Sequence, residues 1–170
     1  MDEQGTVKPD NTPIRETWEA LETVVDEGIA RSIGVSNFQA QSLYDLQRYA
    51  RHPVSSLQIE HHPYLVQPGL IAMAQENKIA VTAYSSFGPQ SFKELPGIFS
   101  KRAHGAEPLL EAELIKGFAD KYSKTPAQIL LRWATQRGIA VIPTAPERQR
   151  NRDNSFLYRH DSYFYYLTGF

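Results

Sequence analysis

Short apolar runs, spaced about one strand-helix unit apart, constrain the fold of this chain more than any other feature. They begin near Ser32, Leu57 and Ile79, and each is followed by a segment whose apolar residues recur at helical spacing. A further run covers Ile139 to Ile142. Strands and helices that alternate at this interval predict a parallel sheet with right-handed crossovers, and therefore an α/β fold.

The chain length limits how much of a barrel these units can build. The chain has 170 residues, enough for one domain with a moderate core. A closed barrel of eight strand-helix units takes about 250 residues. We therefore expect a partial TIM (β/α)8 barrel of about four parallel strands with flanking helices. The open edges of such a sheet predict self-association or pairing with a complementary half barrel.

The sequence divides into three stretches of different character. Residues 1–11 are polar and rich in turn formers, and we expect a flexible lead. Residues 12–143 hold the strand-helix units, and the first helix is expected to have Thr12 as its cap and Pro13 as its first residue. Residues 144–170 begin basic and end dense in aromatic residues, which predicts an unrelated tail.

Composition disfavours several classes of partner. The formal net charge is -1 and charges of both signs are interspersed, so no field draws the chain to nucleic acid or to an anionic membrane. There is no cysteine, which removes disulfides, thiolate metal sites and a Cys nucleophile. No apolar run approaches the roughly 20 residues of a membrane span, and no signal-peptide pattern is present. A cytoplasmic location is expected.

Polar residues follow the carboxyl ends of the expected strands, where a barrel holds its ligands. Ser36 and Asn37 follow the first strand, and the Asn amide offers a donor and an acceptor. They could bind a carboxamide or simply form a polar turn. Gln58 faces away from its neighbours Leu57 and Ile59 by strand alternation, so it needs a polar partner, either a ligand amide or backbone.

A second group of candidates surrounds the end of the third strand. Tyr84 offers a flat ring that could stack on a ligand or pack in the core. Ser85 and Ser86 supply hydroxyl and backbone N–H groups that can hold phosphate. Glu94 could accept from ribose hydroxyls or be a solvated loop charge.

Motifs of other nucleotide, metal and nucleophile sites are absent from the sequence. It contains no G-x-G-x-x-G, no P-loop, no H-E-x-x-H and no G-x-S-x-G. His61 and His62 are neighbours, but adjacent side chains of an extended segment face opposite ways. We therefore expect no metal site from this pair.

Five segments, in order, carry a resemblance to a known family. They are 34–38 (GVSNF), 57–64 (LQIEHHPY), 83–92 (AYSSFGPQSF), 124–128 (KTPAQ) and 131–134 (LRWA) with 138–143 (GIAVIP). Together they resemble the aldo-keto reductases over about residues 12–143, and the second and third are similar to the fungal xylose reductases of that family. The resemblance implies a TIM barrel and NADPH or NADH as cofactor.

The same resemblance implies roles for the candidate residues on the nicotinamide side. Ser36, Asn37 and Gln58 would hold the carboxamide, and Tyr84 would stack on the nicotinamide ring. These residues match the family motifs at the ends of the first three expected strands. The nicotinamide would therefore lie across those strand ends.

On the adenosine side the resemblance is less complete. Ser85 and Ser86 would contact the pyrophosphate, and Glu94 would contact the adenosine ribose. The family usually has Lys-Ser-Asn and a later Arg for the 2′-phosphate of NADP, whereas residues 144–148 read TAPER. Only Arg148 is then expected to remain from that set.

Two departures from the family pattern bear on activity. The family reduces a carbonyl with a Tyr acid assisted by Lys, Asp and His, all from the amino-terminal half of its barrel, and no catalytic residue is assigned here. General acid catalysis is worth about 10²- to 10⁴-fold in rate, so we expect a truncated or chimeric oxidoreductase that is inactive alone. The alternative is a non-catalytic interaction module or a self-associating half barrel.

The second departure is the tail. From about residue 143 onward it resembles the N-terminal domain of aminopeptidase P proteins, without the metal-binding catalytic domain of that family. Peptidase activity is therefore not implied. A natural fusion, a designed chain and a faulty gene model would all explain the change in character.

Overall fold

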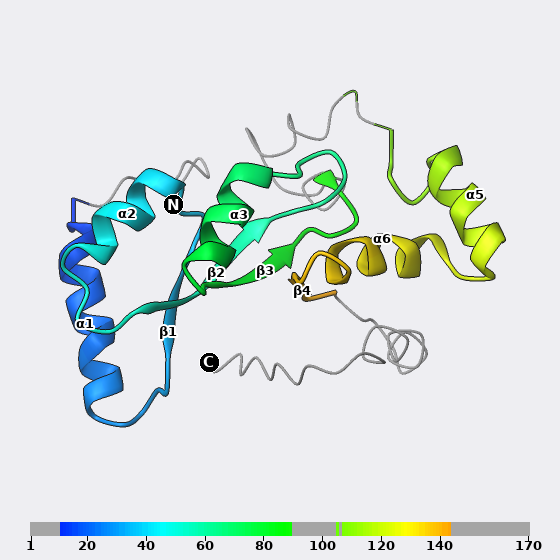
Figure 1. Ribbon diagram of the computed structural model, residues 1–170. Helices are drawn as coiled ribbons and strands as arrows, with labels where there is room; N and C mark the ends of the chain where they lie inside the picture. Colours follow the sequence, from blue (N-terminus) through cyan, green and yellow to red (C-terminus); the bar gives the residue numbers. More distant parts are fainter. Residues whose placement is uncertain (1–10, 90–104, 106, 144–170) are drawn as a thin grey trace, which may run out of the picture.

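Strands and helices alternate through the part of the chain that this computed structural model describes, residues 11–89, 105 and 107–143 (Figure 1). The strands are β1 (Ile33–Ser36), β2 (Val54–Glu60), β3 (Ala80–Tyr84) and β4 (Ala140–Val141). The helices are α1 (Ile14–Asp26), α2 (Ala40–Gln47), α3 (Pro68–Glu76), α5 (Glu113–Tyr122) and α6 (Pro126–Thr135). Within this part of the chain, no helix is long and apolar enough to cross a membrane.

The four strands form one parallel sheet in the order β1-β2-β3-β4. Ser36 lies beside Gln58, and Glu60 lies beside Tyr84. Because the strands are parallel, their carboxyl ends meet at the same edge of the sheet. The predicted α/β fold, with parallel strands and flanking helices, is confirmed.

The two faces of the sheet differ in polarity. One face is buried in the core formed with the helices, and its residues on the central strands are Leu57, Ile59, Val81 and Ala83. By strand alternation the other face carries the side chains of Ser56, Gln58, Glu60, Thr82 and Tyr84. The polar candidates inside the strands therefore share a face.

Close contact between β1 and β2 explains why residue 34 is a glycine. A Cβ added at Gly34 would lie 2.5 Å from the carbonyl oxygen of Ser56 and closer still to its hydroxyl. The strand register shifts between Ile33 and Gly34, and Val54 pairs with Ile33. For this reason β2 begins at Val54, three residues before the expected start near Leu57.

Helices α6 and α1 begin differently. At α6, Thr125 Oγ1 accepts from the Gln128 N–H at 3.2 Å and Gln128 Oε1 accepts from the Thr125 N–H at 2.9 Å, so these two residues form a capping box. At α1 the prediction was wrong, because Pro13 itself occupies the cap position in an extended conformation, with ψ of 143°. Thr12 therefore lies one residue before the cap.

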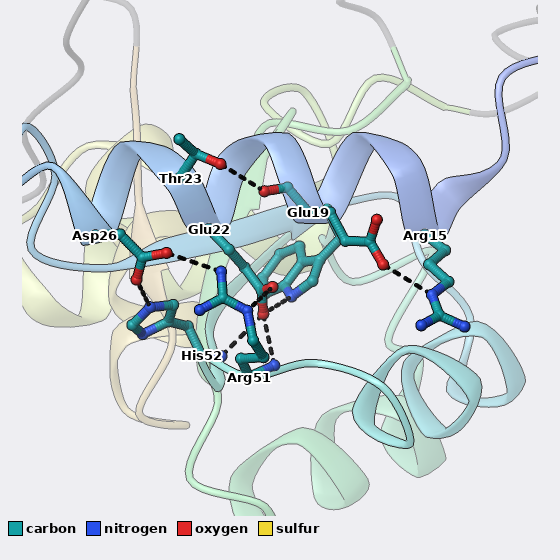
Figure 2. A network of polar contacts seen from close by, with 8 residues as sticks. Arg15, Glu19, Glu22, Thr23, Asp26, Arg51 and His52 are labelled. Atoms are coloured by element: carbon teal, nitrogen blue, oxygen red, sulfur yellow. Dashed lines mark hydrogen bonds and ion pairs between the residues drawn. The ribbon is translucent and has the colours of Figure 1, made fainter.

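A polar cluster, here called the Glu22 cluster, joins α1 to the segment before β2 (Figure 2). The Glu22 carboxylate is 1% exposed and accepts from Trp18 Nε1 at 3.1 Å. It also accepts from the backbone N–H groups of Arg51 at 2.6 Å and His52 at 2.9 Å. Asp26 contacts the side chains of Arg51 at 2.8 Å and His52 at 2.7 Å.

The electrostatics of the Glu22 cluster follow from these donors. Burial alone would raise the pKa of Glu22, but the backbone N–H groups of His52 and Arg51 and the Arg51 charge hold that pKa below its ordinary value. The guanidinium of Arg51, followed by His52, lowers the pKa of Asp26. Both carboxylates therefore favour the ionised form that the cluster requires.

Candidate functional site

The carbonyl of Gln58 anchors the two residues at the end of β1. The Asn37 N–H donates to this oxygen at 2.9 Å, and Ser36 Oγ donates to it at 3.1 Å. The hydroxyl proton of Ser36 is thus used within the sheet. Its oxygen keeps lone pairs that can accept a hydrogen bond from a ligand.

A side-chain hydrogen bond links the ends of β1 and β3 across β2. Tyr84 Oη donates to Asn37 Oδ1 at 2.8 Å. Asn37 has a φ of 60°, in the left-handed region that asparagine tolerates better than most residues. Such conformations cluster at ligand sites, where the surrounding structure enforces them.

The backbone turns sharply after β3. Ser85 has a φ of 52°, Gly88 has a φ of 95°, and the Gly88 N–H donates to the Ser85 carbonyl at 2.9 Å. A Cβ on Gly88 would come within 2.9 Å of Leu109 Cδ1, so the turn packs closely on the segment before α5. Ser86, inside this turn, is 7% exposed, and its Oγ has no hydrogen-bond partner among the described residues.

The adjacent histidines after β2 make different contacts. The His61 ring is fully buried and stacks on Trp133 of α6, with ring centroids 4.8 Å apart. His62 Nε2 lies 3.0 Å from Glu60 Oε1. The prediction that the pair faces different ways is confirmed. Within residues 11–89 and 107–143, no three His, Cys, Asp or Glu side chains gather in a way that could hold a metal ion.

Burial lowers the pKa of His61, and the positive charge of Arg137 lowers it further. The Arg137 guanidinium lies 4.5 Å from the centroid of the Trp133 ring. Neither ring nitrogen of His61 has a partner in the described part of the chain. Within the packing between β2 and α6, His61 therefore favours the neutral form more than a free imidazole does.

The Glu60–His62 contact was missed by the sequence reasoning. Glu60 lies two residues after Gln58 on the same face of β2, and it is paired in register with Tyr84. That spacing alone was a usable signal, since it places Glu60 one step nearer the carboxyl edge. The side-chain partner of Glu60 depended on the turn after β2 and could not be read from spacing.

The predicted site residues are thus placed unevenly. The ends of β1, β2 and β3 bring together Ser36, Asn37, Gln58 and Tyr84. Ser85 and Ser86 lie in the turn that leaves β3. Glu94 and Arg148 lie outside the described residues, so their predicted contacts with the adenosine half stay predictions.

Comparison with known proteins identifies relatives of this arrangement. The family model described as "Aldo/keto reductase family" matches residues 7–162. The probable NAD(P)H-dependent D-xylose reductase xyl1 of Emericella nidulans is 58% identical over 151 residues, which cover 89% of this chain and 46% of that protein. The NAD(P)H-dependent D-xylose reductase xyl1 of Hypocrea jecorina is 57% identical over 147 residues, covering 85% and 44%.

A solved structure shares the fold. The crystal structure of an aldo-keto reductase (AKR2E5) complexed with NADPH matches with a TM-score of 0.76 and 30% sequence identity, over 93% of this chain and 46% of that chain. The part of a TIM barrel that the sequence predicts is confirmed by this match. The chain spans about half the length of the curated relatives it matches.

The family match also extends beyond the predicted limit of the resemblance. It continues to residue 162, whereas the resemblance carried by the sequence motifs was expected to end at about residue 143. The predicted similarity of the tail to aminopeptidase P proteins finds no support in these matches. It stays a prediction about residues that the structure does not describe.

Proposed function

The chain belongs to the aldo/keto reductase family, and from this premise we propose that it binds NADPH or NADH as its xylose reductase relatives do. The nicotinamide would lie across the carboxyl ends of β1, β2 and β3. One observation carries the proposal: Tyr84, Asn37, Ser36 and the Gln58 carbonyl form one hydrogen-bonded set at that edge.

The chemistry of this set suits a carboxamide. A carboxamide presents a carbonyl acceptor and an NH2 donor side by side. Asn37 can donate through Nδ2, and Ser36 Oγ can accept because its proton goes to the Gln58 carbonyl. The Gln58 side chain, on the polar face beside Ser36, supplies a further amide, and the Tyr84 ring offers a surface for stacking.

The turn after β3 supports the pyrophosphate part of the proposal. Ser85 adopts the left-handed conformation, and Ser86 holds a buried hydroxyl without a described partner. A buried hydroxyl is stabilised when it finds a partner, and a phosphate oxygen would provide one. The roles proposed for Glu94 at the ribose and Arg148 at the 2′-phosphate rest on the sequence alone.

We propose that the 170-residue chain binds cofactor without reducing a carbonyl by itself. The family's acid-base group comes from the amino-terminal half of its barrel, and the motifs matched here belong to the other half. Hydride transfer leaves an alkoxide that needs a proton, and no described residue is assigned that task. Aldehyde or aldose reduction would then require the complementary half.

Cofactor titration tests the proposal directly. Saturable binding of NADPH or NADH by the purified chain, measured by calorimetry and weakened in Tyr84→Ala and Asn37→Ala, is the expected result. NADPH oxidation is assayed in parallel with D-xylose and a small aldehyde. Absence of binding would refute the cofactor site, whereas turnover that Tyr84→Ala abolishes would refute only the proposed lack of activity.

A second candidate role rests on the edges of the described sheet. Among the described residues, β1 and β4 each pair with a strand on one side only, and an edge of this kind can pair with another strand. We propose that a second copy or a complementary half barrel pairs with them. Light scattering coupled to size exclusion should show a species larger than the monomer, and a clean monomer at high concentration would contradict this role.

A further inference from the structure

The hydrogen bond between Tyr84 and Asn37 limits what the Asn37 amide can present to a ligand. In the structure the Tyr84 hydroxyl donates to Oδ1 at 2.8 Å, so Oδ1 is the amide atom that faces Tyr84. Nδ2 then points elsewhere, and it has no hydrogen-bond partner in the described part of the chain. In this arrangement the Tyr84 hydroxyl holds Oδ1 and leaves Nδ2 facing away from the ring.

The rest of Asn37 is also held in place. Its N–H donates to the Gln58 carbonyl at 2.9 Å, and its backbone adopts φ of 60°. The side chain is nevertheless exposed, and among the residues that the structure describes the Tyr84 hydroxyl is its one hydrogen-bond partner that restrains the amide against rotation. An exposed amide without that restraint would have to be ordered when a ligand binds.

We propose that the Tyr84 hydroxyl is a positioning group that fixes the orientation of the Asn37 amide, so that Nδ2 is presented as a donor to a ligand carbonyl. This inference rests on the proposed nicotinamide site, and it assigns to Tyr84 a task separate from ring stacking. The Tyr84 ring and the Tyr84 hydroxyl then contribute independently. Loss of the hydroxyl alone alters which ligand groups Asn37 can recognise.

Two cofactors that differ by one group test the orientation. NADPH carries a carboxamide, whereas its reduced 3-acetylpyridine analogue keeps the carbonyl and replaces NH2 by methyl. In Tyr84→Phe the amide is free to turn, so it can accept from the NH2 of NADPH but gains nothing from the methyl of the analogue. We expect Tyr84→Phe to raise the dissociation constant of the analogue about three- to tenfold more than that of NADPH. This difference is the size of one neutral hydrogen bond.

A second variant reports on the amide itself. Asn37→Asp offers acceptors only, so it places an oxygen where Nδ2 would donate. The dissociation constants of both cofactors should rise by about tenfold or more, because a carboxylate oxygen at position 37 then faces the ligand carbonyl. Unchanged NADPH binding in Asn37→Asp would mean that Asn37 accepts from the ligand, which overturns the proposed orientation.

The matched control is Tyr44→Phe on α2. Tyr44 is 53% exposed and lies on α2, outside the hydrogen-bonded set of Tyr84, Asn37, Ser36 and Gln58, so the ratio of the two dissociation constants should not change. Equal weakening of both cofactors in Tyr84→Phe would overturn the inference while leaving the cofactor site intact. Absence of binding of either cofactor to the unaltered chain would instead refute the proposed function.

The positioning role can also be judged without any cofactor. In a 15N–1H spectrum of the ligand-free chain, Tyr84→Phe should shift the side-chain NH2 signals of Asn37, which are identified by their loss in Asn37→Asp. Tyr44→Phe should leave them unchanged. Identical Asn37 signals in the unaltered chain and in Tyr84→Phe would overturn the inference whatever the cofactor experiments give.

Discussion

The Glu22 cluster and the carboxyl edge of the sheet both contain buried polar groups, but they treat those groups differently. At the Glu22 cluster the buried carboxylate accepts from an indole, two backbone N–H groups and a guanidinium. At the carboxyl edge, Ser86 Oγ and both ring nitrogens of His61 lack partners among the described residues. Asn37 and Ser85 also hold left-handed backbone there.

This difference separates a region that stabilises the fold from a region expected to bind a ligand. Barrels of this kind place ligands at the carboxyl ends of their strands, while the opposite end serves stability. Satisfied groups rigidify a fold, whereas a buried group without a protein partner can bond to a ligand or to water. Substitutions in the Glu22 cluster should therefore change the free energy of unfolding, and substitutions at the carboxyl edge should change binding.

The largest expected effect on stability comes from Glu22→Ala. The indole of Trp18 and the N–H groups of Arg51 and His52 would lose their acceptor, which should lower the free energy of unfolding by about 3 kcal/mol. Urea denaturation followed by circular dichroism measures this change. Glu19→Ala is the matched control on the same helix, since its side chain is 55% exposed and its one ion pair within the described part of the chain is with Arg15. A loss no greater than that of the control would contradict the role of the Glu22 cluster.

At the other end of the sheet, Tyr84→Ala should chiefly affect binding. Loss of a stacking ring is worth about 1–3 kcal/mol per base, or roughly 5- to 100-fold in the dissociation constant of NADPH. Calorimetric titration measures the constant, and Tyr122→Ala on α5 is the control because Tyr122 is 56% exposed there. Equal affinity in Tyr84→Ala and the control would rule out stacking on Tyr84.

Acid should affect His61 before Glu22. Because the pKa of His61 is lowered in the folded state, the unfolded state takes up the proton first, and stability falls as pH drops below the ordinary value of 6.5. The pKa of Glu22 is also lowered, so its contribution is full above 4.5 and is lost below that pH.

Urea midpoints measured at pH 7.5 and pH 5.5 test this order. The urea midpoint of the unaltered chain should fall from pH 7.5 to pH 5.5. The midpoint of His61→Leu should fall by less over the same change in pH. The same loss in both proteins would show that His61 does not take up the proton. A Glu22 contribution already missing at pH 5.5 would contradict the order.

Ser86→Ala should show the smallest change in stability. Removing a buried hydroxyl that has no described partner should alter the free energy of unfolding by no more than about 0.5 kcal/mol, yet it should weaken NADPH binding by about threefold. The same calorimetry and denaturation experiments measure both quantities. A marked loss of stability would instead mean that the hydroxyl has a structural partner.

Sequence reasoning located the strand ends well and their contacts poorly. Ser36, Asn37 and Tyr84 follow apolar runs, and strand ends are where a parallel sheet gathers its ligand residues. The bond from Tyr84 to Asn37 was not foreseen, because it depends on how far a ring reaches across β2. Strand periodicity specifies which face a side chain occupies, but not which neighbour it meets.

The burial of Glu22 was missed for a different reason. Glutamate is rarely fully buried, so a charge on an amphipathic helix is assigned to the solvent side by default. Trp18 and Glu22 are one helical turn apart, which puts them on the same stripe. The donors that make the burial tolerable come from residues 51 and 52, about 30 positions away in sequence. Periodicity holds no information about partners at that distance.

The tight approach of β1 and β2 at Gly34 affects how probes could be attached to this protein. Position 34 cannot accept any side chain, whereas a Cβ at Gly69 or Gly117 would meet nothing within 4 Å. Since the chain contains no cysteine, Gly69→Cys or Gly117→Cys would provide one thiol for a fluorescent label. A dye on α3 or α5 would then report cofactor binding from outside the three strands, β1 to β3, whose ends carry the residues proposed to hold the nicotinamide.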